Sequence, residues 1–196
     1  MNEFLSDTGL DKIFRQARTH TAWCGETVSD VLLEAVYDLA KMGPTSMNGC
    51  PLRVAFLRSG AAKEKLRPCL SAGNVEQTMA APVTAIIAYD LAFYEWLPKL
   101  APRRDGAKIF GGKEALIQET AMRNGSLQGA YFIIAARALG LDCGPMSGFS
   151  RAKVDAAFFA GTTWRSNFLC NLGHGDPAAL RPRAARLDFD EACRLL

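Results

Sequence analysis

The stretch Gly43-Pro44-Thr45-Ser46-Met47-Asn48-Gly49-Cys50-Pro51 separates two different sequence patterns. Before it, residues 31–40 carry apolar side chains at helical spacing, and after it residues 53–57 form a short apolar run. Gly43 and Pro44 together end a helix, because glycine tolerates the left-handed cap and proline lacks the N–H that would continue the hydrogen bonds. The stretch is therefore predicted to connect a helix to a strand.

The middle of this stretch offers three short polar side chains, Thr45, Ser46 and Asn48. Such residues are common in any loop between a helix and a strand, so they can be structural and nothing more. Held between two rigid elements, they can also bind a planar polar ligand. The residues alone leave both interpretations open.

Outward from this loop, helical patterns alternate with apolar runs. Residues 83–88 form a continuous apolar, β-branched run, which predicts a central strand. Residues 114–139 carry the longest helical pattern, and its second half is apolar nearly all round, so we expect it to pack against a sheet, a partner subunit or both. Within it, Gly125, Gly129 and Ala130 would allow another backbone to approach closely. A helix is also expected to end near Arg18, and another to be capped by Ser29 or Asp30. The apolar stripe of the latter consists of Val31, Leu32, Ala35, Val36, Leu39 and Ala40. The remaining expected elements are helices at 61–70, after Ser71 and after Ser150 or Asp155, and strands at 53–57 and 167–172.

The 196 residues suit one domain, residues 1–196, with a sizeable core. Hydrophobic residues at 49% and charged residues at 22% are typical of a globular protein, and the net charge of +3 is too small to predict a nucleic-acid surface. No apolar run approaches 18 residues, and the first residues lack the positive region of a signal peptide. We therefore expect no membrane span and a cytoplasmic location.

The six cysteines, at positions 24, 50, 69, 143, 170 and 193, form no C-x-x-C pair and have no short spacing to His20 or His174. No metal site is expected, and in the cytoplasm the thiols should be reduced. A Cys–His nucleophilic pair has nothing specific to support it.

Several other features can be purely structural. Arg18 can bind a ligand or only the last carbonyls of its helix, and Asn74 can bind a ligand or only cap a helix. The segment Gly144-Pro145-Met146-Ser147-Gly148-Phe149 carries turn signals. The arginines at 181, 183 and 186 can be solvated surface charges. Residues 90–112 lose all regular pattern, which is typical of an insertion or a lid.

In this order, these stretches resemble the nitroreductase family of FMN-dependent oxidoreductases. The resemblance rests on six ordered matches: Arg18, Pro44 to Asn48, Asn74 to Val83, the long helix, Pro145 to Phe149, and Arg186. The chain departs from the family pattern at three positions. Cys50 stands where the family usually has glutamine, Leu52 where it often has tryptophan, and Thr21 in place of a second basic residue.

The resemblance implies an α+β fold with a central mixed or antiparallel sheet surrounded by helices, assembled as an intertwined homodimer. FMN would bind at the interface, and the loop at 44–48 would reach the cofactor of the neighbouring subunit. Arginines would grip the phosphate, Asn74 and Gln77 would reach the pyrimidine side, and backbone N–H groups at Ser147 and Gly148 would point at N5. The implied FMN contacts are Arg18, Thr19, His20, Pro44, Thr45, Ser46, Asn48, Asn74, Gln77, Ser147, Gly148, Arg183 and Arg186.

The implied activity is hydride transfer from NADH or NADPH through FMN to a small second substrate, with no catalytic side chain named. The chain most resembles the short subfamily that reduces malonic semialdehyde in pyrimidine catabolism, and Arg103 or Arg104 would then contact the substrate carboxylate. Two alternatives stay open. One is a nitro- or quinone reductase of broad specificity, and the other is a flavin-binding module without catalysis.

Overall fold

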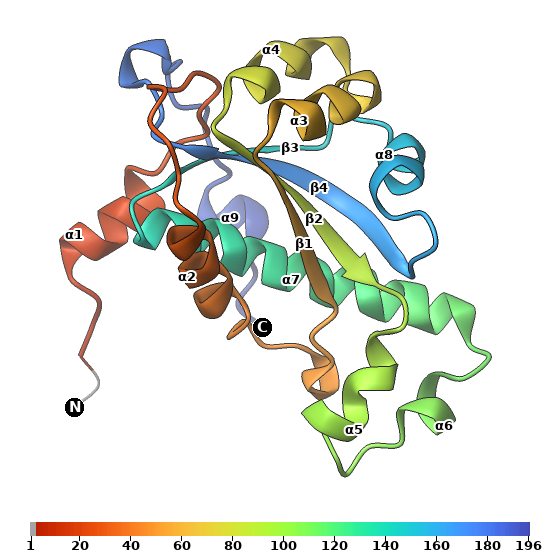
Figure 1. The fold of residues 1–196 in the computed structure, drawn as a ribbon. Coiled ribbons are helices and arrows are strands. Elements are labelled where there is room, and N and C mark those ends of the chain that lie inside the picture. Colours follow the sequence, from red (N-terminus) through yellow and green to blue (C-terminus); the bar gives the residue numbers. More distant parts are fainter. Residues whose placement is uncertain (1–2) are drawn as a thin grey trace.

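The computed structural model describes residues 3–196, and within them one antiparallel sheet of four strands organises the molecule (Figure 1). Its order is β1-β2-β4-β3, and all three pairings are antiparallel. The strands are β1 (Leu52–Leu57), β2 (Val83–Asp90), β3 (Asp142–Met146) and β4 (Trp164–Gly173). Every residue of β2 is buried, which confirms the predicted central strand. The fold is α+β.

The strand register gives the sheet two ends that matter for the site. At one end Leu52 pairs with Tyr89 and Asp90 pairs with Trp164; we call this the Leu52 end. At the other, Asp142 pairs with Gly173; we call this the Asp142 end. The loop at 43–51 leads into the Leu52 end, because β1 begins there.

One face of the sheet is covered by α7 (Glu114–Ala138), with α2 (Asp30–Ala40) packed against it. A Cβ added at Gly125 would lie 2.8 Å from the Cβ of Tyr89, and one added at Gly129 would lie 2.8 Å from the Phe168 ring. These glycines therefore let α7 approach the sheet of its own chain. The expected close approach of another backbone is confirmed at Gly125, where the Tyr89 Cα of β2 would lie 3.8 Å from the added Cβ, whereas Gly129 meets side chains and Ala130 lies on the exposed side.

The opposite face is covered by three helices, α3 (Gly60–Leu66), α4 (Ala72–Ala80) and α8 (Arg151–Phe158). Leu66, Ile86 and Leu169 form the centre of this second core, whereas Ile87 faces α7, as strand alternation requires. The helices begin where the sequence places their caps. Ser29 and Ser150 accept hydrogen bonds from backbone N–H groups three residues later, which confirms the first of the two alternatives for each helix start.

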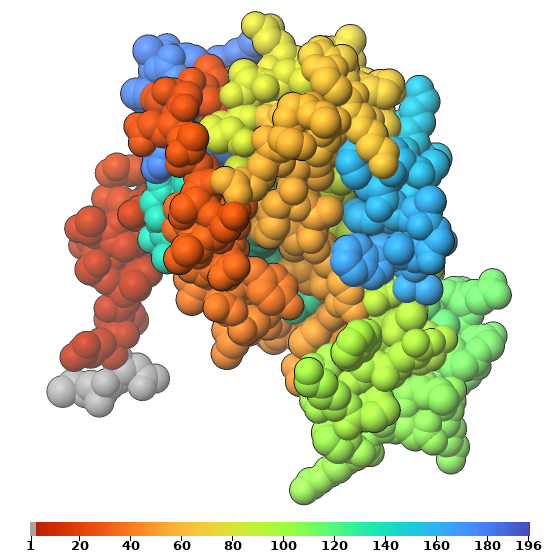
Figure 2. Space-filling view, viewed as in Figure 1, coloured from red at the N-terminus to blue at the C-terminus, as the bar shows by residue number. Residues whose placement is uncertain are grey.

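The segment 91–112 is more regular than its sequence indicates. It contains a short 3-10 turn at Phe93–Trp96, then α5 (Leu97–Leu100) and α6 (Gly106–Phe110). Phe93 and Phe110 meet edge to face with centroids 5.0 Å apart, and both pack with Tyr89 and Leu97. Figure 2 shows this segment, coloured yellow-green to green, as a lobe that projects from the body of the molecule.

The chain begins its described part with α1 (Asp7–Leu10) and a π-helical turn at Asp11–Arg15, so the predicted first helix is confirmed. Thr19 then forms an isolated bridge with Cys143 on the outer edge of β3. After β4 the chain passes a 3-10 turn at Pro177–Ala179 and ends with α9 (Phe189–Ala192). No helix among residues 3–196 is long and apolar enough to cross a membrane.

Two sequence predictions are wrong at the level of elements. Gly144-Pro145-Met146 was predicted as a turn and is instead the second half of β3, where Pro145 is tolerated because β3 lies at the edge of the sheet. In α2 the predicted apolar stripe is displaced, since Val31 and Leu39 are 75% and 46% exposed while Leu33 is buried.

Candidate functional site

Four arginines converge on one cavity beyond the Asp142 end of the sheet. The cavity holds about 410 Å³, and no acidic residue of the described chain lines it. None of the four arginines takes part in an ion pair with a described residue. Guanidinium groups suit phosphate and carboxylate oxygens, so this cavity is built for an anion. It is lined by Phe14, Ala17, Arg18, Thr19, Arg137, Arg183, Ala184 and Arg186.

Two of these arginines, Arg18 and Arg183, hold two distant parts of the chain together. The Arg183 guanidinium donates to the carbonyls of Arg15 and Ala17, at 2.8 and 2.9 Å, and Arg18 donates to the carbonyl of Arg181. The C-terminal tail is thus held against the end of the first helix. Arg186 bonds only its own neighbourhood, the carbonyls of Ala184 and Ala185, both at 3.0 Å.

The fourth arginine, Arg137, was missed by the sequence analysis. It stands in the last turn of α7, where its Nη1 donates over 3.4 Å to the carbonyl of Ile13 and its buried Nε has no partner among the described residues. A signal was present, because Arg137 is the one charged residue in the stretch 127–139, which is apolar apart from Gln128.

A second cavity, of about 710 Å³, lies next to the first, since Arg18 and Thr19 line both. It passes Trp23 and the side of α4 that carries Gly73 and Gln77. The Gln77 carbonyl accepts hydrogen bonds from Trp23 Nε1, at 3.1 Å, and from Asn171 Nδ2, at 3.3 Å, which fixes α4 to the wall.

Asn74, Gln77 and Gly148 lie together at the far side of this wall. The Asn74 amide donates to the Gly148 carbonyl over 2.9 Å, and Gln77 Nε2 donates to Asn74 Oδ1 over 2.6 Å. A Cβ at position 148 would overlap the Asn74 amide, so a larger residue there would displace this amide from its hydrogen bond to the residue 148 carbonyl. Ser71, and not Asn74, is the N-cap of α4. Capping therefore does not explain Asn74.

His20 does not join this group through its side chain. Its ring is 6% exposed and lines neither cavity, and its Nε2 lies 3.4 Å from Asp142 Oδ1. A Cβ at Gly175 would overlap the ring, so His20 fills a space beneath the end of β4. Its backbone N–H, in turn, donates to the Cys143 carbonyl at 3.0 Å.

The loop at 43–51 lies at the other end of the sheet, where β1 begins. Thr45 Oγ1 accepts the Cys50 N–H at 3.2 Å, the Ser46 N–H donates to Asn124 at 2.7 Å, and Asn48 Nδ2 donates to the Leu100 carbonyl at 2.8 Å. The polar groups of Thr45 and Asn48 thus hold the loop and tie it to α5, whereas the side chains of Pro44 and Ser46 are exposed.

Backbone strain is concentrated in the same loop. Met47, Asn48 and Cys50 have φ angles of 55°, 54° and 42°, in the left-handed region that side chains disfavour. Strain of this kind persists only where the surroundings hold it, and it gathers at functional sites.

Arg103 and Arg104, which follow α5, are exposed and belong to the same end of the molecule.

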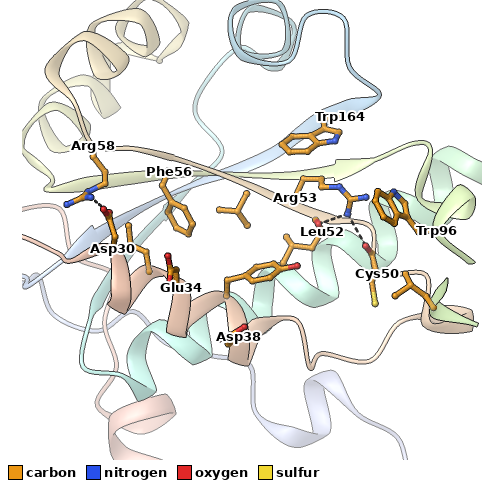
Figure 3. A pocket seen from close by; sticks show the side chains of 14 residues that line it. Asp30, Glu34, Asp38, Cys50, Leu52, Arg53, Phe56, Arg58, Trp96 and Trp164 are labelled. Atoms are coloured by element: carbon orange, nitrogen blue, oxygen red, sulfur yellow. Dashed lines mark hydrogen bonds and ion pairs between the residues drawn. The ribbon is translucent and has the colours of Figure 1, made fainter.

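A cavity of about 860 Å³ between α2 and β1 holds none of the predicted FMN contacts (Figure 3). Its α2 side is acidic, with Asp30, Glu34 and Asp38, and its β1 side carries Arg53 and Arg58. The two sides neutralise each other in part, since Arg58 pairs with Asp30. Arg53 also donates to Asp90, at 2.6 Å, outside the lining. Glu34 has no ion pair with a described residue, so the unpaired charge of this cavity is negative, opposite to that of the arginine cluster.

The fold and the cavities together define a class: α+β proteins in which a four-stranded antiparallel sheet, crossed by one long helix, carries an arginine-lined cavity at one end. A family model described as the nitroreductase family matches residues 15–174. The chain belongs to the nitroreductase family.

Curated relatives cover nearly the whole chain. A protein of Burkholderia lata is 60% identical over 97% of this chain and 98% of its own length, and one of Stutzerimonas stutzeri is 54% identical over 100% of both. Both carry the name "Putative NADH dehydrogenase/NAD(P)H nitroreductase".

Solved structures show the same fold at low sequence identity. A nitroreductase family protein of Streptococcus pneumoniae superposes with a TM-score of 0.81 at 18% identity, covering 94% of this chain and 98% of its own. A protein of Exiguobacterium sibiricum, solved in complex with FMN and described as a nitroreductase, gives 0.84 at 17% identity over 100% of both chains.

Proposed function

We propose that this protein is an FMN-dependent oxidoreductase that takes electrons from NADH or NADPH. The observation that carries the proposal is the convergence of four arginines without ion pairs in the described chain on a cavity that shares Arg18 and Thr19 with a second, larger one. A flavin mononucleotide has the matching shape, a dianionic phosphate at one end and a planar polar ring at the other. The names of the curated relatives and the FMN bound by a protein of the same fold support the assignment.

The residues present fit FMN in three places. Arg18, Arg183 and Arg186 hold the phosphate, and Thr19 lies between the two cavities, where a ribityl chain would pass. Asn74 and Gln77 offer amide donors and acceptors to the pyrimidine edge. Gly148, without a side chain, lets the backbone approach N5. When bound, FMN supplies the hydride chemistry, and the chain's share is to orient it and its substrates.

The functional unit in this proposal is a homodimer. Pro44, Thr45, Ser46 and Asn48 lie at the Leu52 end, so a single chain does not bring them to the arginine cluster. In a dimer, the loop and the 91–112 lobe of one chain cover the ring held by the other. The outer sides of α2 and α7 support this assembly, because Leu39, Leu127 and Tyr131 are 46%, 47% and 41% exposed.

The proposed second substrate is malonic semialdehyde, a small aldehyde with a carboxylate. Arg103 and Arg104 have no recorded ion pair with a described residue and stand on the lobe that would close over the ring. One of them would bind the carboxylate. The second candidate is a nitroarene or quinone, which the names of the curated relatives favour.

Two measurements test the proposal. A visible spectrum of the purified protein should show flavin absorption, and its absence after incubation with FMN would reject the cofactor. Steady-state oxidation of NADH and NADPH, with malonic semialdehyde, a nitroarene or a quinone as acceptor, then separates the substrates. Bound FMN with negligible turnover on all three would identify a flavin-binding module instead.

A further inference from the structure

Arg137 occupies a position that a structural arginine rarely has. It lies in the last turn of α7, beside the buried Ala135 and Ala136, and Figure 1 shows this end of α7 next to α1. Its Nη1 makes one long hydrogen bond of 3.4 Å to the Ile13 carbonyl, and its Nε is buried without a partner in the described chain. A guanidinium carries five donors, and buried donors left unpaired destabilise a fold.

Neither of the usual structural roles accounts for this side chain. A cation near a helix C-terminus is favourable, but an exposed side chain gives that effect without burial. An ion pair is the other role. Asp142, the acid at this end of the sheet, already accepts the Gly175 N–H at 2.9 Å and faces His20 at 3.4 Å.

The cavity gives the Arg137 guanidinium access to an anionic partner. Arg137 lines the same 410 Å³ space as Arg18, Thr19, Arg183 and Arg186, and no acidic residue of the described chain lines it. These arginines stand on parts of the chain with different secondary structure. Arg183 and Arg186 stand in residues 180–188, which have no regular secondary structure, whereas Arg137 stands on a helix of 25 residues packed against the sheet.

We propose that Arg137 is a fourth phosphate ligand and the fixed one, binding the FMN phosphate from the floor of the cavity. Arg18, Arg183 and Arg186 then close over it from the side of the tail. The inference rests on the proposed function and adds to it the residue that sets where the phosphate lies. It predicts that one substitution weakens FMN binding without lowering the stability of the apo-protein.

The test is Arg137→Leu, with flavin binding measured on apo-protein by fluorescence quenching. FMN affinity should fall roughly tenfold to a hundredfold, the usual effect of losing a charge-assisted hydrogen bond, while riboflavin affinity changes less than twofold. The thermal midpoint of the apo-protein should stay equal or rise, because an unpaired buried guanidinium is removed. Arg137→Lys, which keeps the charge but loses the fork, should lie between the parent and Arg137→Leu in FMN affinity.

Arg67→Leu is the control, since Arg67 is exposed, pairs with Glu64 and lines neither cavity. It should leave both affinities unchanged. Equal losses for FMN and riboflavin with a lower apo midpoint would show a structural role and overturn the inference, as would an unchanged FMN affinity. If Arg137→Leu does not fold, the same two assays on Arg137→Lys decide. A parent that binds neither flavin overturns the proposed function itself, and this inference with it.

Discussion

Each arginine of the cluster makes a separate, measurable contribution if the anion is the FMN phosphate. Arg18→Ala or Arg186→Ala should weaken FMN binding by about 1.5 to 3 kcal/mol, the usual contribution of a charge-assisted hydrogen bond. Riboflavin, which lacks the phosphate, should bind almost as before. Titration of apo-protein with both flavins measures the difference.

The two substitutions also differ in their side effects. Arg18 donates to the Arg181 carbonyl and so helps to hold the tail, whereas Arg186 bonds only Ala184 and Ala185. Arg186→Ala is therefore the cleaner variant. If it weakens FMN and riboflavin to the same degree, the arginine supports the fold and the phosphate assignment fails.

The six cysteines should react with thiol reagents in an order set by burial. Cys24 and Cys193 are exposed and should react first, with the half-buried Cys50 slower. Burial raises the pKa of Cys69, and a hydrogen bond with Cys143 together with burial raises the pKa of Cys170 well above its usual value. The thiolate is the reactive form, so Cys69 and Cys170 should react only after unfolding. Cys143 should behave in the same way because its side chain is buried and reagents cannot reach it.

A timed thiol assay at pH 7, with and without denaturant, measures this order. The variant Cys24→Ser, Cys193→Ser should lose the fast phase and keep the rest. Rapid reaction of Cys170 in the native protein would mean that the β3–β4 pairing opens readily, contrary to the fold described.

At the scale of elements, short sequence patterns predict the features of a helix or strand that depend on neighbouring residues in the chain. The cap at Ser29 and the central strand predicted from the β-branched run at 83–88 are confirmed. The helix before Gly43 ends at Ala40, three residues before that glycine. β3 was missed because Gly144 and Pro145 carry turn signals, and only its place at the sheet edge makes a strand acceptable. The helices of 91–112 depend on contacts of Phe93 and Phe110 with distant residues, which no local pattern contains.

The 91–112 lobe carries the prediction about substrate. If Arg103 or Arg104 binds the carboxylate of malonic semialdehyde, the parent should prefer it to propanal by roughly tenfold to a hundredfold in kcat/KM, the equivalent of about 1.4 to 3 kcal/mol. The double variant Arg103→Ala, Arg104→Ala should lose this preference, with little change toward propanal. Steady-state kinetics with both aldehydes decides. A parent that reduces propanal equally well does not recognise the carboxylate, and broad specificity should replace this proposal.

At the scale of the whole molecule, the predicted contacts separate into two groups. Arg18, Thr19, Gln77, Arg183 and Arg186 line two cavities that have Arg18 and Thr19 in common, and Asn74 and Gly148 are hydrogen-bonded beside Gln77. Thr45 and Asn48 lie at the opposite end, where their polar groups bond Cys50 and Leu100 instead. The sequence identifies these residue types but does not state which chain each one serves, because that depends on assembly.

The apolar side of α7 provides a test of assembly. Leu127 is 47% exposed, and Leu127→Glu should convert a dimer to monomers, because burying an unpaired carboxylate costs several kcal/mol. Gly129 is unsuitable for this purpose, since any side chain there meets Phe168 of the same chain. Analytical ultracentrifugation of the parent, Leu127→Glu and the conservative Leu127→Met measures the outcome. A parent that is monomeric with FMN bound would contradict the dimer.

The central claim is that each FMN is bound by the arginine cluster of one chain and the 44–48 loop of the other. Two differently tagged variants test it when combined in one dimer: Arg18→Ala with Arg186→Ala, which impairs the phosphate site, and Ser46→Trp, which obstructs the exposed loop. Each homodimer should bind FMN poorly. The mixed dimer should bind one FMN per dimer with nearly the affinity of the parent, because one of its two sites combines an intact cluster with an intact loop. A mixed dimer that binds FMN as poorly as both homodimers would show that each site is formed within a single chain, and would contradict the account.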